Sequence, residues 1–215
     1  MLNDATLLGN RINENIRLYS SDYYRPSQLL NLSYAQNVFS LIHFNINNIT
    51  SYQKFDNICD ILWRFAYKFI AVTETCLNGN NCQVYQIPDY VSFHKPRKAI
   101  RKENSGGISC FVLAEFKPII YEIPKNLLPN EQVAEFLCIH CRSTKYLVLV
   151  IYRPPQGSSS LFVQSVTNIL SFLATRRSPI IITGDLNINL LNYQTCSVTR
   201  HLVETLFIQF ETCDY

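Results

Sequence analysis

Two side chains that could bind a cation follow a short apolar run near the end of the sequence. Asp185 and Asn187 lie in SPIIITGDLNINLL, residues 178–191, directly after three isoleucines, a threonine and Gly184, which we expect to end the strand. A carboxylate and an amide two residues apart on an extended chain lie on one side of it. Their oxygen atoms suit a hard cation such as Mg²⁺ and the phosphate that it holds. Gly, Asp and Asn are also common turn residues, so a simple turn is the alternative.

Three further polar side chains recur at the ends of apolar runs: Asn45, Glu74 and Tyr152. Each alone has a plainer explanation. Asn45 could cap a turn, Glu74 could be an exposed loop residue, and Tyr152 could pack beside the prolines that follow it. Their joint recurrence favours a site, because ligands in open α/β sheets bind in the crevice beyond the strand ends.

A basic segment could contact the phosphates of a nucleic acid. KPRKAIRK, residues 95–102, carries five basic residues in eight. Most charge runs are solvated loops, which is the alternative here. The net charge of +3 and the sequence pI of about 8.4 are compatible with a nucleic-acid partner but do not require one.

The elements that must position these residues alternate between strands and helices. Strands are predicted over 38–44, 68–72, 90–94, 108–116, 132–140, 146–152 and 180–184, and helices over 52–65, 159–175 and 198–210. In the first helix, Ile58 and Leu62 share one apolar face, with Trp63 expected at its edge. The opening strand–helix–strand order indicates a layered α/β domain. The tight connection after residue 140 predicts an antiparallel pair and therefore a mixed sheet.

The composition is that of a globular domain with a substantial core. The chain has 215 residues, of which 47% are hydrophobic and 16% charged, and this composition argues against disorder. Residues 1–36 are polar and predict a loosely structured leader before a domain over 37–215. No apolar run reaches the roughly 18 residues of a spanning helix, and the first residues do not resemble a secretory signal. We therefore expect no membrane partner and an intracellular location.

The eight cysteines are expected to be reduced thiols, given an intracellular location. Cys138-Ile-His-Cys141 resembles half of a zinc site. Strand alternation, however, would place Cys138 and His140 on one face and Cys141 on the other. No second pair closes a tetrahedral site, so zinc is not expected here.

Taken together, these segments resemble the endonuclease/exonuclease/phosphatase (DNase I-like) family, and within it the apurinic-type endonuclease domain of non-LTR (LINE-like) retrotransposons. The matching segments are LIHFNINNI around Asn45, IAVTETCL around Glu74, GGISCFV at Gly106, VIYRPP around Tyr152 and ITGDLNINLL around Asp185. They keep the family's order over most of residues 20–210. The resemblance implies a four-layer α/β sandwich, with two mixed β-sheets flanked by helices.

The resemblance also implies Mg²⁺- or Mn²⁺-dependent hydrolysis of DNA phosphodiester bonds, which nicks a target strand in the nucleus to prime reverse transcription. Glu74 looks like the principal metal ligand, with Asn45 beside it. Tyr152 is similar to the tyrosine that contacts the scissile phosphate. Asp185 looks like the aspartate that positions or activates water, and Asn187 like the asparagine that binds the phosphate. The candidate DNA contacts are Arg97, Lys98, Arg101, Lys102 and Arg153.

Some features depart from the family pattern. Asn47-Asn48 replaces a frequent Arg-Ser, and the Ser-Asp-His motif expected near the C-terminus is missing. The reverse transcriptase domain expected in a parent element is also absent. We therefore expect a truncated domain that lacks its last strands and has impaired activity. A catalytically inactive remnant with residual DNA binding and a phosphatase of the same fold remain as alternatives, whereas nothing specific supports a protein-interaction module.

Overall fold

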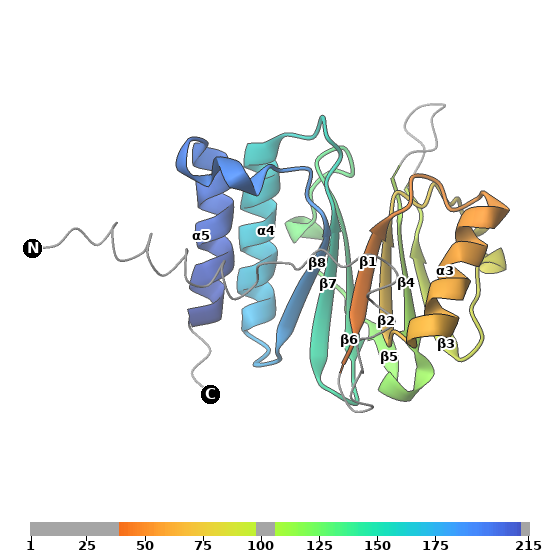
Figure 1. Cartoon of the computed structure of the whole chain (residues 1–215). Coiled ribbons are helices and arrows are strands. Elements are labelled where there is room, and N and C mark those ends of the chain that lie inside the picture. Colours follow the sequence, from red (N-terminus) through yellow and green to blue (C-terminus); the bar gives the residue numbers. More distant parts are fainter. Residues whose placement is uncertain (1–38, 98–105, 212–215) are drawn as a thin grey trace, which may run out of the picture. The chain divides into compact units, whose positions relative to one another are not determined.

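Two four-stranded β-sheets form the centre of this computed structural model, which describes residues 39–97 and 106–211 (Figure 1). The first sheet has the order β1-β2-β4-β3, with β1 Leu41–Asn45, β2 Phe69–Thr73, β3 Tyr90–Lys95 and β4 Ile108–Leu113. The second has the order β5-β6-β7-β8, with β5 Pro118–Ile120, β6 Glu135–Cys141, β7 Tyr146–Tyr152 and β8 Ile180–Asp185. The predicted leader lies outside the described residues.

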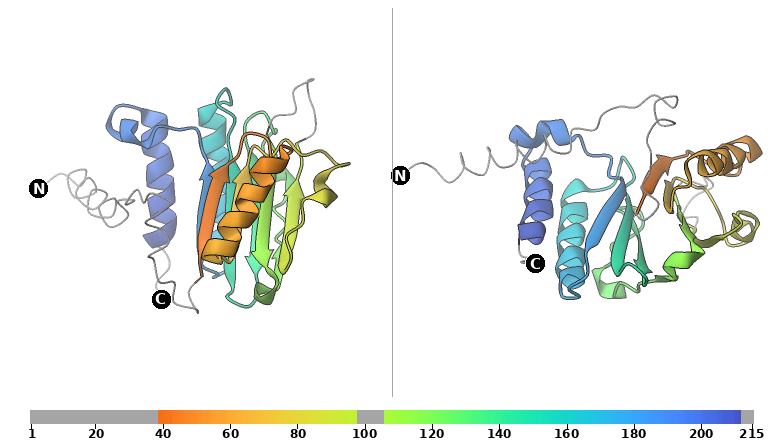
Figure 2. Two further views of the ribbon diagram at one scale, coloured as in Figure 1. Left: turned by 45° about the vertical axis from the view of Figure 1, so that its right-hand side comes forward. Right: turned by 60° about the horizontal axis from the view of Figure 1, so that its bottom comes forward.

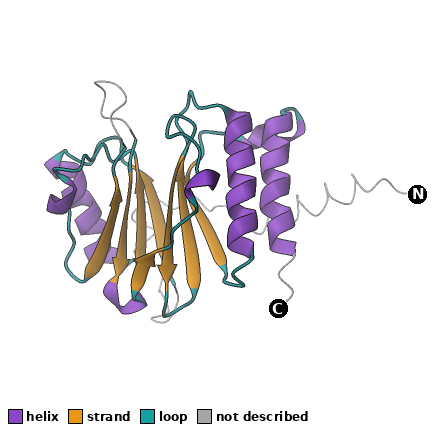
Figure 3. Cartoon of the chain, turned by 180° about the vertical axis from the view of Figure 1, so that it is seen from behind, coloured by secondary structure: helices purple, strands orange, loops and turns teal. Residues whose placement is uncertain are grey.

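Helices cover the outer face of each sheet. α3 (Tyr52–Phe65) packs on the first sheet, and α4 (Ser159–Ala174) on the second, beside α5 (Ser197–Glu211). Figure 2 shows this order from two further sides, and Figure 3 shows the orange strands between the purple helices. β1 pairs in parallel with β2, and β7 with β8, while the other pairs are antiparallel. The four-layer sandwich with two mixed sheets is therefore confirmed.

Strand alternation divides the core into three apolar clusters. In β7, Val148 and Val150 face the other sheet, whereas Leu147 and Leu149 face α4. Tyr152 continues the inward-facing row to the end of the strand. Both faces of β7 are buried, which explains why YLVLVIY reads as a continuous apolar run.

The first helix follows its predicted pattern except at its tryptophan. Ile58 and Leu62 are buried against the sheet, and Ala66 ends the helix in a left-handed conformation with its N–H donating to Leu62 O (2.8 Å). Trp63, expected at the edge of this face, is 90% exposed. One residue turns an α-helix by about 100°, which takes Trp63 away from the face that holds Leu62.

Several strand boundaries differ from the sequence prediction, among them the ends of β4 and β8. The strand predicted over 108–116 ends at Leu113, because Ala114–Phe116 forms a 3-10 turn. Gly184 does not end its strand, since β8 continues through it to Asp185. β5 was not predicted, because three residues are too few to show a period.

The Cys138–Cys141 segment follows the predicted alternation. Cys138 packs in the cluster beneath α4, while Cys141 packs between the sheets. Among the described residues, no group of three His, Cys, Asp or Glu side chains could hold a metal ion. In the same part of the chain, no helix is both long and apolar enough to cross a membrane.

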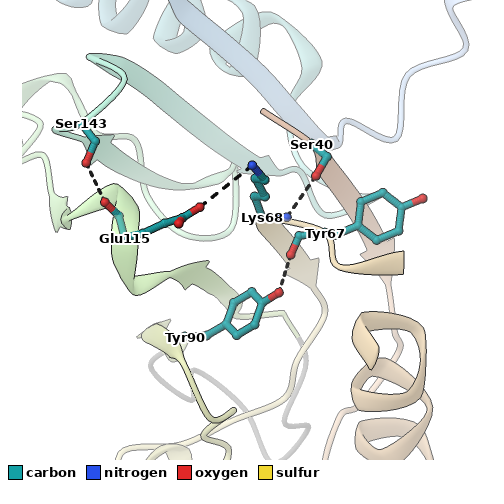
Figure 4. Close-up of polar contacts among 6 residues, drawn as sticks. All are labelled: Ser40, Tyr67, Lys68, Tyr90, Glu115 and Ser143. Carbon is teal, nitrogen blue, oxygen red and sulfur yellow. Dashed lines mark hydrogen bonds and ion pairs between the residues drawn. The ribbon is translucent and has the colours of Figure 1, made fainter. Parts of the chain in front are cut away.

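Polar contacts gather at the end of the sandwich where β2 begins (Figure 4), and one of them joins the two sheets. The Ser143 hydroxyl, in the turn after β6, donates to Glu115 O (2.7 Å), and the Glu115 carboxylate lies 4.0 Å from Lys68 Nζ. The Tyr90 hydroxyl donates to Tyr67 O (2.5 Å). These contacts lie at one end of the sandwich, and the predicted site residues lie at the opposite end.

Candidate active site

Four strand ends bring polar residues to one rim of the sandwich. In the first sheet, Asn45 ends β1 opposite Thr73, which ends β2. In the second sheet, Asp185 ends β8 opposite Tyr152, which ends β7, and Tyr152 lies opposite Glu135 on its other side. The carboxyl ends of two parallel pairs thus meet at the rim, which is where α/β sheets bind ligands.

Asn45 joins two carboxylates that come from different sheets. Its Nδ2 donates to Glu74 Oε1 (3.0 Å) and to Asp185 Oδ2 (2.7 Å), and its Oδ1 accepts from Asn47 N (3.2 Å). The side chain of Asn45 thus contacts two of the other four residues singled out by the sequence. The amide nitrogen of Asn45, and not its oxygen, faces the carboxylates.

Tyr152 completes this group from the second sheet. Burial most of all, and then the negative charge of Glu74 and a hydrogen bond to it, raise the pKa of Tyr152. The side chain is only 3% exposed. A phenol with a raised pKa stays protonated at physiological pH, so the Tyr152 hydroxyl can donate a hydrogen bond.

The Asp185–Asn187 segment is a turn that also presents a carboxylate. Asp185 Oδ1 accepts from Asn187 N (3.0 Å), and Asn187 has a φ of 47°. Asn187 Nδ2 donates to Arg153 O (2.7 Å). Asn187 is therefore not extended, and the expectation that its side chain follows Asp185 along one side of a strand is wrong. The turn and the site are not alternatives, because the Asp185 carboxylate has a second oxygen that reaches Asn45.

The backbone around Glu74 is held in an uncommon conformation. Glu74 and Cys76 have φ angles of 55° and 56°, in the left-handed region that favours glycine. Asn48 N donates to Glu74 O (2.7 Å) and Ile49 N to Thr75 O (3.0 Å), so the loop after β1 holds the loop after β2. Such conformations cost on the order of 1 kcal/mol each and concentrate at functional sites.

The donor set fits a hard cation. Glu74 and Asp185 offer carboxylate oxygens, and Mg²⁺ is usually bound by one or two carboxylates together with water. Asn45 would contribute its oxygen only after its amide turns over, because the nitrogen now faces Glu74. These oxygens are therefore of the kind that Mg²⁺ or Mn²⁺ prefers.

The basic residues predicted to contact DNA divide into two groups. Lys98, Arg101 and Lys102 lie outside the described residues. Arg97 is largely buried and lies 3.6 Å, Nε to Oε1, from the carboxylate of Glu135. Sequence reasoning could not foresee this ion pair, because the partner lies on the other sheet.

Arg153 has a structural role in the described chain. It is 6% exposed, and its guanidinium donates to Asn187 O (2.8 Å) and Gly157 O (2.5 Å). It thereby holds the turn after β8 against the loop that leads to α4. Little of the guanidinium remains exposed to a phosphate, so we do not retain Arg153 among the DNA contacts proposed below.

Replacement of Arg153 by Met should lower the free energy of unfolding by about 2–3 kcal/mol, because it leaves partly buried carbonyl oxygens without a charged donor. Chemical denaturation of the two proteins measures this loss. The exposed Arg177→Met serves as the control and should change stability by less than about 0.5 kcal/mol. Equal stability of the Arg153 and Arg177 variants would contradict the structural role.

His43 is a rim residue that the sequence analysis missed. It lies two residues before Asn45 in β1, and its Nε2 is 3.0 Å from Thr73 Oγ1. Burial lowers the pKa of His43, while the charge of Asp185 acts in the opposite direction. Its spacing of two from Asn45 was the available signal, because alternate residues share one face of a strand.

Glu135 is a second missed residue, and it is a buried carboxylate. Burial raises its pKa from 4.5 to about 7, against the lowering effects of the Gly107 N–H and of Arg97. The Glu135 side chain is fully buried. From sequence, Glu135 was simply a polar residue within the strand predicted over 132–140.

The stability of the fold should therefore depend on pH through Glu135. A carboxyl whose folded pKa is raised favours the folded state below its unfolded pKa, and this contribution is lost as pH rises through the folded value. Between about pH 4.5 and 7 the protein should lose up to about 3 kcal/mol relative to Glu135→Gln, which cannot titrate. Denaturation of both proteins at pH 5 and pH 8 tests this, and parallel pH profiles would contradict it.

No family model and no curated protein matches the sequence, but solved structures do match the fold. The 3′ phosphatase NExo from Neisseria, bound to a product DNA hairpin, aligns with a TM-score of 0.61 at 12% identity, over 80% of this chain and 71% of its own. The endonuclease domain of TRAS1, a telomere-specific non-LTR retrotransposon, aligns with 0.56 at 11%, over 80% and 72%. The mannosyl-6-phosphatase Bt3783 from Bacteroides thetaiotaomicron aligns with 0.54 at 15%, over 78% and 70%. At these identities the likeness establishes a shared fold.

Proposed function

The chain has the fold of the endonuclease/exonuclease/phosphatase proteins, and from this fold and its rim we propose that it is a Mg²⁺- or Mn²⁺-dependent endonuclease that hydrolyses DNA phosphodiester bonds. One observation carries the proposal. Glu74 and Asp185 come from different sheets and meet through Asn45, with Tyr152 against Glu74. Retrotransposon target nicking in the nucleus is the corresponding biological role.

Each residue of the rim has a chemical task in this proposal. Glu74 would hold the cation, with Asn45 beside it, and a bound divalent cation supplies positive charge that offsets the charge of the phosphate. Asp185 accepts a hydrogen bond from the attacking water and orients it. Tyr152, neutral at physiological pH, would turn its single O–H from Glu74 to a phosphate oxygen. Asn187 would donate the Nδ2 hydrogen that Arg153 O does not accept. Lys98, Arg101 and Lys102 contact the DNA backbone.

A phosphatase of the same fold is the second candidate, and the likeness to a mannosyl-6-phosphatase is the observation that favours it. Carboxylates around a cation suit a phosphomonoester as well as a phosphodiester. The basic residues Lys98, Arg101 and Lys102 favour DNA, because a polyanion offers many phosphates to successive cations.

Supercoiled plasmid incubated with the purified protein tests the proposal. With Mg²⁺ or Mn²⁺ we expect conversion to the open-circular form, and none with EDTA or with Asp185→Asn. Release of phosphate from a sugar phosphate without plasmid nicking would support the phosphatase. Retention of plasmid in a gel shift without nicking would identify the inactive DNA-binding remnant.

A further inference from the structure

The buried Glu135 carboxylate links the two sheets at the rim of the candidate active site. It projects from β6 of the second sheet, where its Oε2 accepts from Gly107 N (2.9 Å) and its Oε1 lies 3.6 Å from Arg97 Nε. Gly107 directly precedes β4 of the first sheet, and Arg97 is the second residue after β3. Glu135 therefore ties one sheet to the other, as Asn45 does on the opposite side of Glu74.

The segment that Glu135 holds also carries the Glu74 loop. Thr75 N donates to Gly107 O (3.3 Å), and Cys76 N donates to Gly106 O (2.8 Å). These are the two residues that follow Glu74, whose own backbone is left-handed. The hydrogen bonds thus run from Glu135 through the two glycines to the backbone on which the Glu74 side chain stands.

The glycines fit this contact closely. A Cβ on Gly106 would lie 2.4 Å from Glu135 Oε1, and one on Gly107 would lie 2.6 Å from Thr75 Oγ1. Both residues also have positive φ, 84° and 89°. No side chain can separate Glu135 from the backbone that it binds, so a shift of the carboxylate is passed on to the Glu74 loop.

Glu135 also lies next to Tyr152, the residue through which the second sheet contacts Glu74. It lies opposite Tyr152 in the antiparallel β6–β7 pair, and the Tyr152 hydroxyl bonds the Glu74 carboxylate. We propose that Glu135 is a positioning residue that fixes the spacing between Glu74 on one sheet and Tyr152 on the other, through Gly107 and Arg97. Its effect on catalysis rests on the proposed function, but its effect on the Glu74 loop does not.

Amide hydrogen exchange without metal or DNA tests the positioning role directly. In Glu135→Gln we expect the Thr75 and Cys76 amides to exchange about tenfold faster, while amides in the middle of α4 keep their rates. Asp60→Asn, which neutralises an exposed carboxylate on α3, should change neither. Unchanged protection of Thr75 and Cys76 in Glu135→Gln would overturn the inference. So would faster exchange in α4 to the same degree, because that indicates a general loss of stability.

Kinetics then test what the positioning does. We expect kcat for plasmid nicking by Glu135→Gln to fall about 10–100-fold and half-saturation by Mg²⁺ to require more metal, with KM for DNA little changed. If the wild-type protein nicks no DNA but its amides respond as expected, the proposed function fails and the positioning role stands. If nicking and metal dependence are the same in the wild type and in Glu135→Gln, the catalytic part is overturned.

Should Glu135→Gln fail to fold, Arg97→Gln provides a second variant. It removes the other partner of the ion pair and should speed the exchange of the Thr75 and Cys76 amides to a smaller degree.

Discussion

Replacement of Glu74 by Gln is expected to lower the rate of metal-dependent plasmid nicking by about 10³-fold. Gln has the size of Glu and keeps an oxygen to accept the bonds from Asn45 Nδ2 and from Tyr152. It loses the negative charge that a cation requires. The expected loss is therefore one of chemistry and not of structure.

Single-turnover nicking at saturating Mg²⁺ measures the rate, and chemical denaturation shows whether the fold is kept. The stability of Glu74→Gln should remain within about 1 kcal/mol of the wild type, because the side chain is only partly buried. Asp60→Asn is the control for the loss of one negative charge and should nick at the wild-type rate. A Glu74→Gln protein that nicks at the wild-type rate would exclude Glu74 as the metal ligand.

Replacement of Gly184 by Ala is expected to destabilise the fold by about 4 kcal/mol or more, and to leave most of the expressed protein insoluble. Gly184 pairs with Ile151 in the parallel β7–β8 ladder, with a φ of 136°. A Cβ there would lie 1.9 Å from Ile151 O and 2.8 Å from Ile151 N and C. These are backbone atoms within a sheet, which can move away only if the two strands separate.

Gly79→Ala is the matched control for this prediction. Gly79 lies in an exposed loop, and a Cβ there would have no atom within 4 Å. Soluble expression and the free energy of unfolding, measured for both variants, should differ from the wild type only for Gly184→Ala. Equal stability of the two variants would show that β7 and β8 do not approach as closely as described.

The sequence by itself predicted the elements with a clear local period. The helix over 52–65 and the strand over 146–152 have the predicted bounds, because repeating apolar residues within one segment record a buried face. It also indicated which residues end the strands, and these ends are the rim that holds Asn45, Glu74 and Asp185. The resemblance on those residues predicted the fold of two mixed sheets, which the structure confirms.

Only the tertiary structure decided which of these residues touch, and through which atoms. Asn45 and Asp185 are 140 residues apart, and nothing in either segment specifies that the amide nitrogen of one bridges to the carboxylate of the other. In the same way, the sequence shows Arg97 only as one basic residue in a charged run. Its ion pair with Glu135 depends on the sheet that packs opposite. The physical reason is that a residue pattern records the face of a strand on which a side chain lies, whereas its partner depends on which strand packs opposite. The backbone conformation at Glu74 likewise depends on hydrogen bonds from a loop that comes from another strand.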